Sequence, residues 1–104
     1  MQVKRIKFER TGGFAGMRMA TDLKWDDLPE HQADTIMALL DELDFRELPK
    51  HIAEKESMPD QFTYTITVET DHWEHTVVTG EDSAPEKLQE LLQQLSHLAR
   101  TRRK

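Results

Sequence analysis

The chain has 104 residues, a formal net charge of −6 and no cysteine. A chain of this length forms one domain with a sizeable buried core. The lack of cysteine excludes thiol catalysis, disulfide frameworks and cysteine-ligated zinc. No apolar run approaches the roughly 20 residues that a membrane span requires, and the charged start, Met1 to Lys7, lacks the pattern of a signal peptide. We therefore expect a cytoplasmic protein that does not contact membranes.

Charge is distributed unevenly along the chain. Residues 1–20 carry a net charge of +4, residues 21–90 of −14 and residues 91–104 of +4. The acidic middle argues against nucleic-acid binding, which needs a continuous basic surface. The basic tail from Arg100 to Lys104 follows a predicted helix, whose C-terminal dipole favours cations. A role of this tail as a nucleic-acid arm is the alternative, which a gel shift with and without the tail distinguishes.

Two strands are predicted in the first part of the chain. Polar and apolar residues alternate from Lys4 to Arg10, with Ile6 and Phe8 facing inward. A second alternation, from Met17 to Leu23, predicts an antiparallel return strand. A shift of its pairing by one residue would turn its methionines to solvent, so the register is well specified.

Two amphipathic helices are predicted, each beginning near a proline. For the first, Asp27 is expected to cap the helix, Glu30 to close a capping box, and Pro29 to occupy the first turn. Ser83 and Glu86 repeat this device before the second helix. We expect the first helix to end near Asp44 or Phe45. The inward stripes are Ala33, Ile36, Met37, Leu40 and Leu43 in the first helix, and Leu88, Leu91, Leu92, Leu95, Leu98 and Ala99 in the second.

The segment from Arg46 to Gln61 shows no periodicity. It is longer than most loops that compact domains keep without a use. It is either a surface connection or a second binding segment, with one short helical turn in residues 51–58. Both interpretations stay open at this point.

The clearest strand is Phe62 to Glu69, with four inward residues and a threonine-rich outer face. A turn at Asp71 and His72 leads to a return strand from Trp73 to Thr79. We therefore expect an α+β fold, in which a four-stranded antiparallel sheet carries two amphipathic helices on one face, in the order ββα-loop-ββα. The single domain, residues 1–104, consists of a first half (1–45), a long loop (46–61) and a second half with the basic tail (62–104).

Catalytic and metal-binding patterns are not evident. His72 and His75 lie three residues apart in an extended segment, so their side chains leave on opposite faces. No His-Glu-x-x-His motif, phosphate loop or nucleophile elbow occurs. We expect a protein that is not an enzyme and has no metal or cofactor.

A glycine-rich segment, Arg10-Thr11-Gly12-Gly13-Phe14-Ala15-Gly16, joins the first two strands. Glycine allows the sharp turn or close backbone approach that such a connection needs. Phe14 either packs on the domain's own core as a lid or is offered to a partner.

Several segments together resemble the emfourin family, small protein inhibitors of protealysin-like, thermolysin-type zinc metalloproteases. They are the glycine segment with Met17, an acidic helix begun by Leu28-Pro29, Pro59-Asp60-x-Phe62-x-Tyr64-x-Ile66-x-Val68, the return strand His75-Thr76-Val77, and Pro85-Glu86-x-Leu88. The resemblance covers nearly the whole chain and implies a thermolysin-like metalloprotease as the partner. The expected turn glycine is missing at Asp71-His72.

Thermolysin-type enzymes cut before a bulky apolar residue, and their zinc keeps one coordination position open. The resemblance therefore leads to a hypothesis in which Phe14 enters the pocket beside the zinc, while the flanking backbone adds strand-like hydrogen bonds in the cleft. The candidate contact residues are Gly12, Gly13, Phe14, Ala15, Gly16 and Met17, with Leu48, Pro49, Met58 and Pro59 as a second arm.

The rival hypothesis is a non-inhibitory protein-interaction module that uses the acidic helix face around Asp34, Asp41 and Glu42. Binding through that face would collapse at high salt, whereas an apolar anchor depends weakly on salt. Either hypothesis suits a monomer or a weak dimer.

Overall fold

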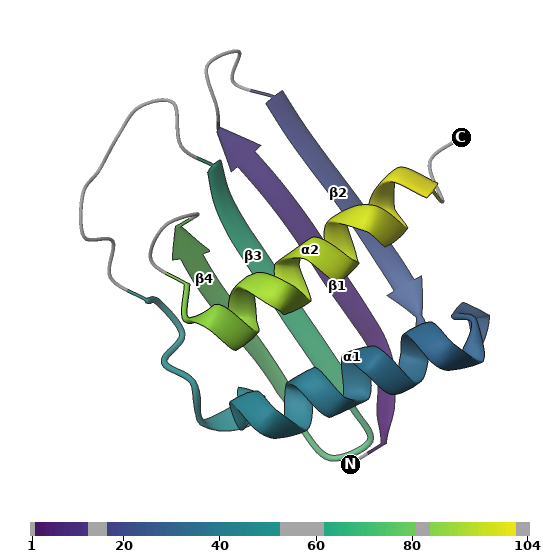
Figure 1. Cartoon of the computed structure of the whole chain (residues 1–104). Coiled ribbons are helices and arrows are strands. Elements are labelled where there is room, and N and C mark those ends of the chain that lie inside the picture. The colour runs from purple at the N-terminus through teal and green to yellow at the C-terminus, as the bar shows by residue number, and fades with distance from the viewer. Residues whose placement is uncertain (1, 13–16, 53–61, 81–83, 102–104) are drawn as a thin grey trace.

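The computed structural model describes residues 2–12, 17–52, 62–80 and 84–101. Within these ranges, four strands and two helices follow one another in the predicted order: β1 (Val3–Gly12), β2 (Met17–Lys24), α1 (Glu30–Leu43), β3 (Phe62–Thr70), β4 (Glu74–Gly80) and α2 (Glu86–Thr101). The 3-10 turns η1 (Trp25–Asp27) and η2 (Phe45–Glu47) flank α1. Both helices cover the same face of the sheet (Figure 1). The predicted α+β architecture is confirmed.

The strands are arranged in the order β2-β1-β3-β4, and all neighbours are antiparallel. Two hairpins supply the outer pairings, and the central pairing of β1 with β3 joins the two halves of the chain. Ile6 lies opposite Leu23 on one side and Val68 on the other. These three residues are almost completely buried, so the predicted inward faces of three strands are confirmed.

The core lies between the sheet and the two helices. Every residue of the stripe predicted for α2 is buried, and Leu88, Leu91 and Leu95 have no exposed surface. In α1, Ile36, Leu39 and Leu40 are buried, while Ala33, Met37 and Leu43 are half-buried. Full burial of one such aliphatic side chain stabilises the fold by about 1.5–3 kcal/mol. The smallest dimension of the molecule, 20 Å, matches one helix layer on one sheet layer.

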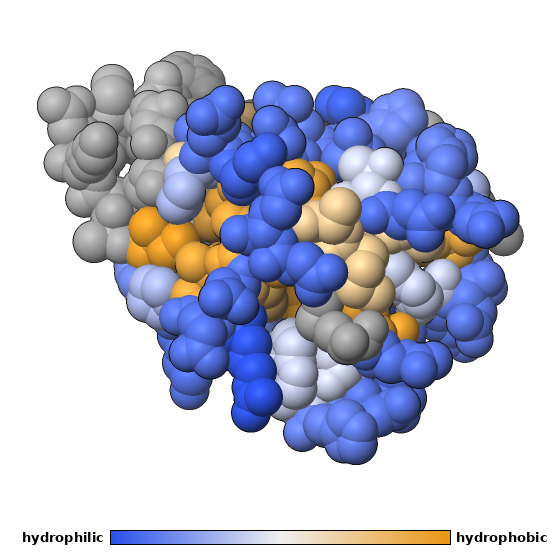
Figure 2. Space-filling view, turned by 60° about the horizontal axis from the view of Figure 1, so that its bottom comes forward, coloured by the Kyte–Doolittle hydropathy of each residue, from blue (hydrophilic) through white to orange (hydrophobic). Residues whose placement is uncertain are grey.

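Apolar side chains also reach the surface at the margin of this core. Figure 2, which brings the bottom of Figure 1 forward, shows hydrophobic patches between hydrophilic side chains. The partly buried hydrophobic residues that pack against the core are Met19, Trp25, Ala33, Met37, Leu43, Leu48, Ile52, Phe62 and Trp73. The helix layer therefore covers the sheet incompletely at its margins.

The predicted start of α1 is wrong in its detail. The helix begins at Glu30 with Pro29 as the N-cap residue, whereas the prediction had Asp27 as the cap and Pro29 in the first turn. The reason is Pro29, because the residue before a proline is kept out of helical geometry. Leu28 is accordingly extended (ψ 140°), and its N–H donates to the carbonyl oxygen of Trp25. α2 likewise begins directly after Pro85, and Ser83 lies outside the described residues.

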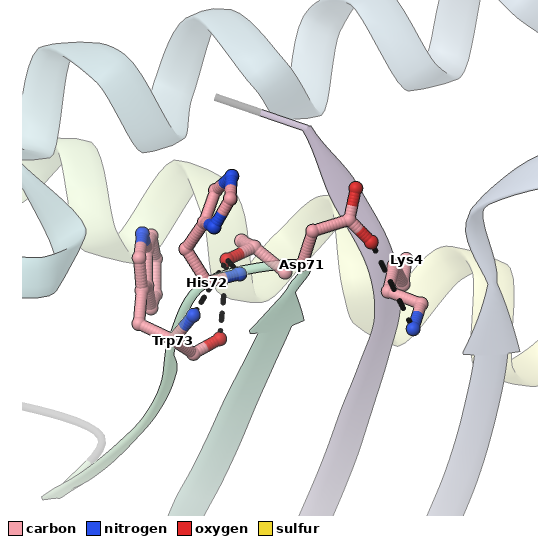
Figure 3. Close-up of polar contacts among 5 residues, drawn as sticks. Lys4, Asp71, His72 and Trp73 are labelled. Carbon is pink, nitrogen blue, oxygen red and sulfur yellow. Dashed lines mark hydrogen bonds and ion pairs between the residues drawn. The ribbon is translucent and has the colours of Figure 1, made fainter.

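The turn between β3 and β4 needs no glycine (Figure 3). The hydroxyl oxygen of Thr70 accepts hydrogen bonds from the backbone N–H groups of His72 (3.1 Å) and Trp73 (3.0 Å). The backbone N–H of Thr70 donates to the carbonyl of Trp73 at 2.8 Å. Asp44, at the C-terminus of α1, is the one non-glycine residue with positive φ among those described. The missing glycine at Asp71-His72 is thus explained by a side chain that satisfies the turn's donors.

Replacing Thr70 by valine is expected to lower the free energy of unfolding by about 1–2 kcal/mol, because two backbone donors lose their acceptor. Urea unfolding measures this change. The matched control is Thr63→Val in the same strand, since no side-chain hydrogen bond of Thr63 is found among the described residues. Equal stabilities of the two variants would show that the Thr70 hydroxyl does not stabilise the turn.

The described part of the 46–61 segment is attached to the sheet. His51 forms a parallel bridge with Val78, the N–H of Ile52 donates to the carbonyl of Val78, and the N–H of Val78 donates to that of Lys50, both at 2.8 Å. The predicted helical turn is therefore wrong at His51, which is extended because it pairs with the edge of β4. Residues 53–61 lie outside the described ranges.

Candidate protein-binding site

The β1–β2 hairpin has a regular base. Eight consecutive pairs join the two strands, from Arg5 opposite Lys24 to Gly12 opposite Met17, without a bulge. Gly12 also lies opposite Phe62 of β3, so the backbone before the glycine segment is paired on both sides. Its φ of 98° is a conformation that glycine adopts without steric cost and that a Cβ atom disfavours. The sequence places a glycine where the backbone requires one.

The tip of the predicted site falls outside the described residues. This holds for Gly13, Phe14, Ala15 and Gly16, and equally for Met58 and Pro59 of the proposed second arm. Gly12 and Met17 are located at the ends of the paired strands that lead to the tip. The assignment of Phe14 as an anchor stays a prediction.

A row of aromatic rings runs from the core to this end of the sheet. The ring of Phe8, buried in the core, stacks on Tyr64 with centroids 5.9 Å apart, and Tyr64 lies 6.5 Å from Phe62. The guanidinium of Arg10 lies over the ring of Phe62, 4.5 Å from its centroid. Such cation–π contacts contribute about 0.5–1 kcal/mol at exposed sites. The row fixes Phe62 and Arg10 beside Gly12.

A polar hollow of about 420 Å³ lies between α2 and this end of the sheet. Its lining consists of Arg10, Tyr64, Gln89, Leu92, Gln93, Ser96 and Arg100. The side-chain N–H of Gln89 donates to the carbonyl of Ala84 at 3.0 Å, which holds that amide in place at the start of α2. The α2 residues of the lining recur at three- and four-residue steps, so they form one stripe along the helix.

The described part of the second arm lies at the other edge of the sheet. Leu48 is half-buried against the core, and its carbonyl oxygen is 2.7 Å from Nε2 of His75 in β4. Pro49 is exposed. Across the sheet, His75 is paired with Val68, which is paired with Ile6. Ile6 lies six residues before Gly12 on β1, roughly 20 Å along the strand. Leu48 and Pro49 are therefore not brought together with Gly12.

The acidic face of α1, on which the rival hypothesis rests, is partly neutralised. Asp34 and Asp41 are exposed. Glu42 forms an ion pair of 3.0 Å with Lys87 of α2, and its hydrogen bond raises the pKa of that lysine. The pair joins the two helices at the surface, and solvent screening leaves it a small contribution to stability.

The described residues contain no group of three or more His, Asp or Glu side chains that could hold a metal ion. Neither helix, over its described length, is long and apolar enough to span a bilayer. The prominent features of this part of the molecule are the paired hairpin base, the aromatic row and the polar hollow, which all lie at one end of the sheet. The protein is thus a small two-layer α+β domain, and one end of its sheet is the candidate protein-binding site.

Comparison with known families gives the identity of this domain. The chain matches the model of the Emfourin family over residues 8–96, and it therefore belongs to that family. The resemblance inferred from the sequence is confirmed. Membership suggests a protease inhibitor rather than an enzyme. Comparisons with curated proteins and with solved structures found no match.

Sequence reasoning missed the hollow and the aromatic row beside the hairpin. The position of Arg10 could have been predicted. It follows Ile6 and Phe8 at two-residue steps along the strand, so its side chain lies on the same, helix-covered face. The glutamines of α2 gave a weaker signal, since polar residues on a helix are usually solvated. Their convergence on Arg10 depends on how α2 crosses the sheet, which no local pattern specifies.

Proposed function

We propose that this protein inhibits a thermolysin-type zinc metalloprotease by inserting the segment between β1 and β2 into the substrate cleft. The observation that carries the proposal is membership of the Emfourin family over residues 8–96. The structure adds a reason why this segment suits the task, because both of its ends emerge from paired strands.

The hairpin base reduces the entropic cost of binding. A free peptide loses conformational freedom when a cleft orders it, and a segment held at both ends loses less. Here the continuous ladder from Arg5 to Gly12 supplies one support, and β3 supplies a second at Phe62. A segment held at both ends by paired strands is therefore expected to bind the protease tightly and to resist cleavage better than a free peptide.

Phe14 is the proposed anchor of the complex. In a cleft that selects bulky apolar residues, its ring fills the pocket beside the zinc, and Gly13 admits the protease backbone closely because it has no side chain. The backbone around them adds strand-like hydrogen bonds to the enzyme. The chain blocks the cleft and supplies no catalytic group.

The long segment 46–61 is the proposed second arm, with Leu48, Pro49, Met58 and Pro59 as its contacts. In the sequence, Pro59 precedes Phe62 by three residues, and Phe62 lies directly opposite Gly12. Leu48 and Pro49 are less favourably located, because they lie beside β4. We therefore assign the larger share of this arm's contacts to Met58 and Pro59.

The experiment that tests the proposal is incubation of thermolysin with increasing amounts of the protein, followed by measurement of residual activity on a short peptide substrate. We expect inhibition that more substrate relieves, because the inhibitor and the substrate compete for one cleft. Undiminished activity of thermolysin and of a protealysin-like enzyme at high inhibitor concentration would contradict the proposal. Inhibition that is abolished by Asp41→Lys but not by Phe14→Ala would favour the acidic helix face instead.

A further inference from the structure

Two arginines, Arg10 and Arg100, contribute to the lining of the hollow beside the hairpin. Among the described residues that line it there is no aspartate or glutamate. The hollow on the open face of the sheet combines Lys7 with Glu9 and Asp22, and the hollow at the far end combines three basic with four acidic residues. In a protein of net charge −6, the described lining of this hollow differs from those two because its charged side chains are all basic.

Ion pairs with carboxylates involve only some of the described cations, and neither arginine of the hollow is among them. Lys4, Arg5, Arg18 and Lys87 each form an ion pair with a carboxylate. No such pair is found for Arg10 or Arg100 among the described residues. The Arg10 guanidinium instead lies over the ring of Phe62, with its central carbon 4.5 Å from the ring centroid. Two cations that line one hollow raise the local concentration of anions.

We propose that this hollow binds a carboxylate side chain, an aspartate or glutamate on the surface of the metalloprotease, while the hairpin occupies the cleft. The inference rests on the proposed function and adds a second recognition element to it. Arg10 lies two residues before Gly12 on β1, roughly 7 Å along the strand. An enzyme that holds the hairpin therefore brings its own surface against the hollow.

The chemistry of the lining suits a carboxylate. Guanidinium groups present N–H donors in a fork that matches the two oxygens of a carboxylate, a geometry that lysine lacks. Gln93 and Ser96 add neutral donors from the same stripe of α2. Because charge pairs across an interface determine orientation and exclude wrong partners, the hollow favours proteases with an acidic residue beside the cleft and disfavours those with a basic one.

The test compares two charge reversals that change the net charge equally. Arg100→Glu places a negative charge at the hollow. The control, Lys24→Glu, places the same charge at the end of β2 that is farther from the β1–β2 hairpin segment. We expect Arg100→Glu to raise the inhibition constant against thermolysin at least about tenfold, because a carboxylate then faces a carboxylate. Lys24→Glu changes it less than about threefold, since a distant exposed charge is screened at physiological salt.

A second pair of variants probes Arg10. Arg10→Gln removes the charge and keeps a polar chain of similar reach, and we expect weaker inhibition with a smaller salt dependence. Arg10→Lys keeps the charge but loses the forked donor geometry of the guanidinium, so we expect its inhibition constant to lie between those of the wild type and Arg10→Gln. Urea unfolding of each variant shows whether it is folded, and Arg100, which is exposed, gives the reading least affected by stability.

Three results would overturn the inference. If wild-type protein inhibits and both Arg100→Glu and Arg10→Gln behave like Lys24→Glu, the hollow takes no part in binding while the proposed function stands. If wild-type protein does not inhibit, the function and the inference fail together. If a labelled single-stranded oligonucleotide binds the protein, and Arg100→Glu abolishes this binding without weakening inhibition, the arginines serve nucleic acid instead.

Discussion

Replacement of Phe14 by alanine is expected to weaken inhibition of thermolysin by about 30- to 1,000-fold, the range that loss of a buried aromatic anchor produces. The reason is that the ring supplies the apolar surface that the pocket beside the zinc selects, while the base of the hairpin remains paired. The measurement is the inhibition constant from residual activity on a peptide substrate. Phe14→Leu is the matched control, and it should retain most of the affinity because leucine also fills an apolar pocket.

Unfolding curves of the same variants distinguish the two roles that the sequence left open for Phe14. If the ring is an anchor for a partner, Phe14→Ala leaves the free energy of unfolding within about 0.5 kcal/mol of the wild type. If the ring is a lid on the domain's own core, the same change lowers that free energy by about 3–5 kcal/mol. A loss of inhibition of less than about threefold would move the anchor elsewhere and make the 46–61 segment the leading candidate.

The largest effect on stability is expected for Phe8→Ala, which should lower the free energy of unfolding by about 3–5 kcal/mol. Phe8 is 1% exposed, stacks on Tyr64 and lies between Thr21 and Ile66 in neighbouring strands. Its loss leaves a cavity in the middle of the sheet's helix-covered face. Since domains of this size are stable by about 5–15 kcal/mol, the change removes a large share of that stability.

Urea unfolding followed by circular dichroism measures the effect of Phe8→Ala. Lys7→Thr, its neighbour on the open face, is the control and should change stability by less than about 0.5 kcal/mol, because the Lys7 side chain is exposed. A loss of less than about 1 kcal/mol for Phe8→Ala would mean that the helix layer is not packed on β1 as described.

Much of the fold was predictable because its signals are local. The alternation of Phe62, Tyr64, Ile66 and Val68 defines a strand with one inward face, and the leucine spacing of α2 defines a helix stripe. Burial confirms the inward side of both. The pairing of β1 with β3 was not predictable in this way, since it joins segments about fifty residues apart in the chain.

The predictions that were wrong, the start of α1 and a helical conformation at His51, concern positions where a local pattern is overridden by an adjacent residue or strand. Asp27 and Glu30 have the spacing of a capping box, but Pro29 keeps Leu28 extended and moves the helix start. His51 is extended because β4 offers an unpaired edge, which the sequence of the segment itself does not reveal. For the candidate site, the sequence indicated the glycine segment, whereas the polar hollow follows from how α2 crosses the sheet.

The central position of β1 has a consequence for the order in which the protein acquires its shape. β1 is made first but lies between β2 and β3, and its β3 partner leaves the ribosome only after some fifty further residues. Until then one flank of the nascent hairpin is a bare edge, and contacts between such distant segments form slowly. A truncated product that stops before Phe62 would present the proposed inhibitory segment on an unsupported ribbon, open to cleavage by the enzyme that it should block.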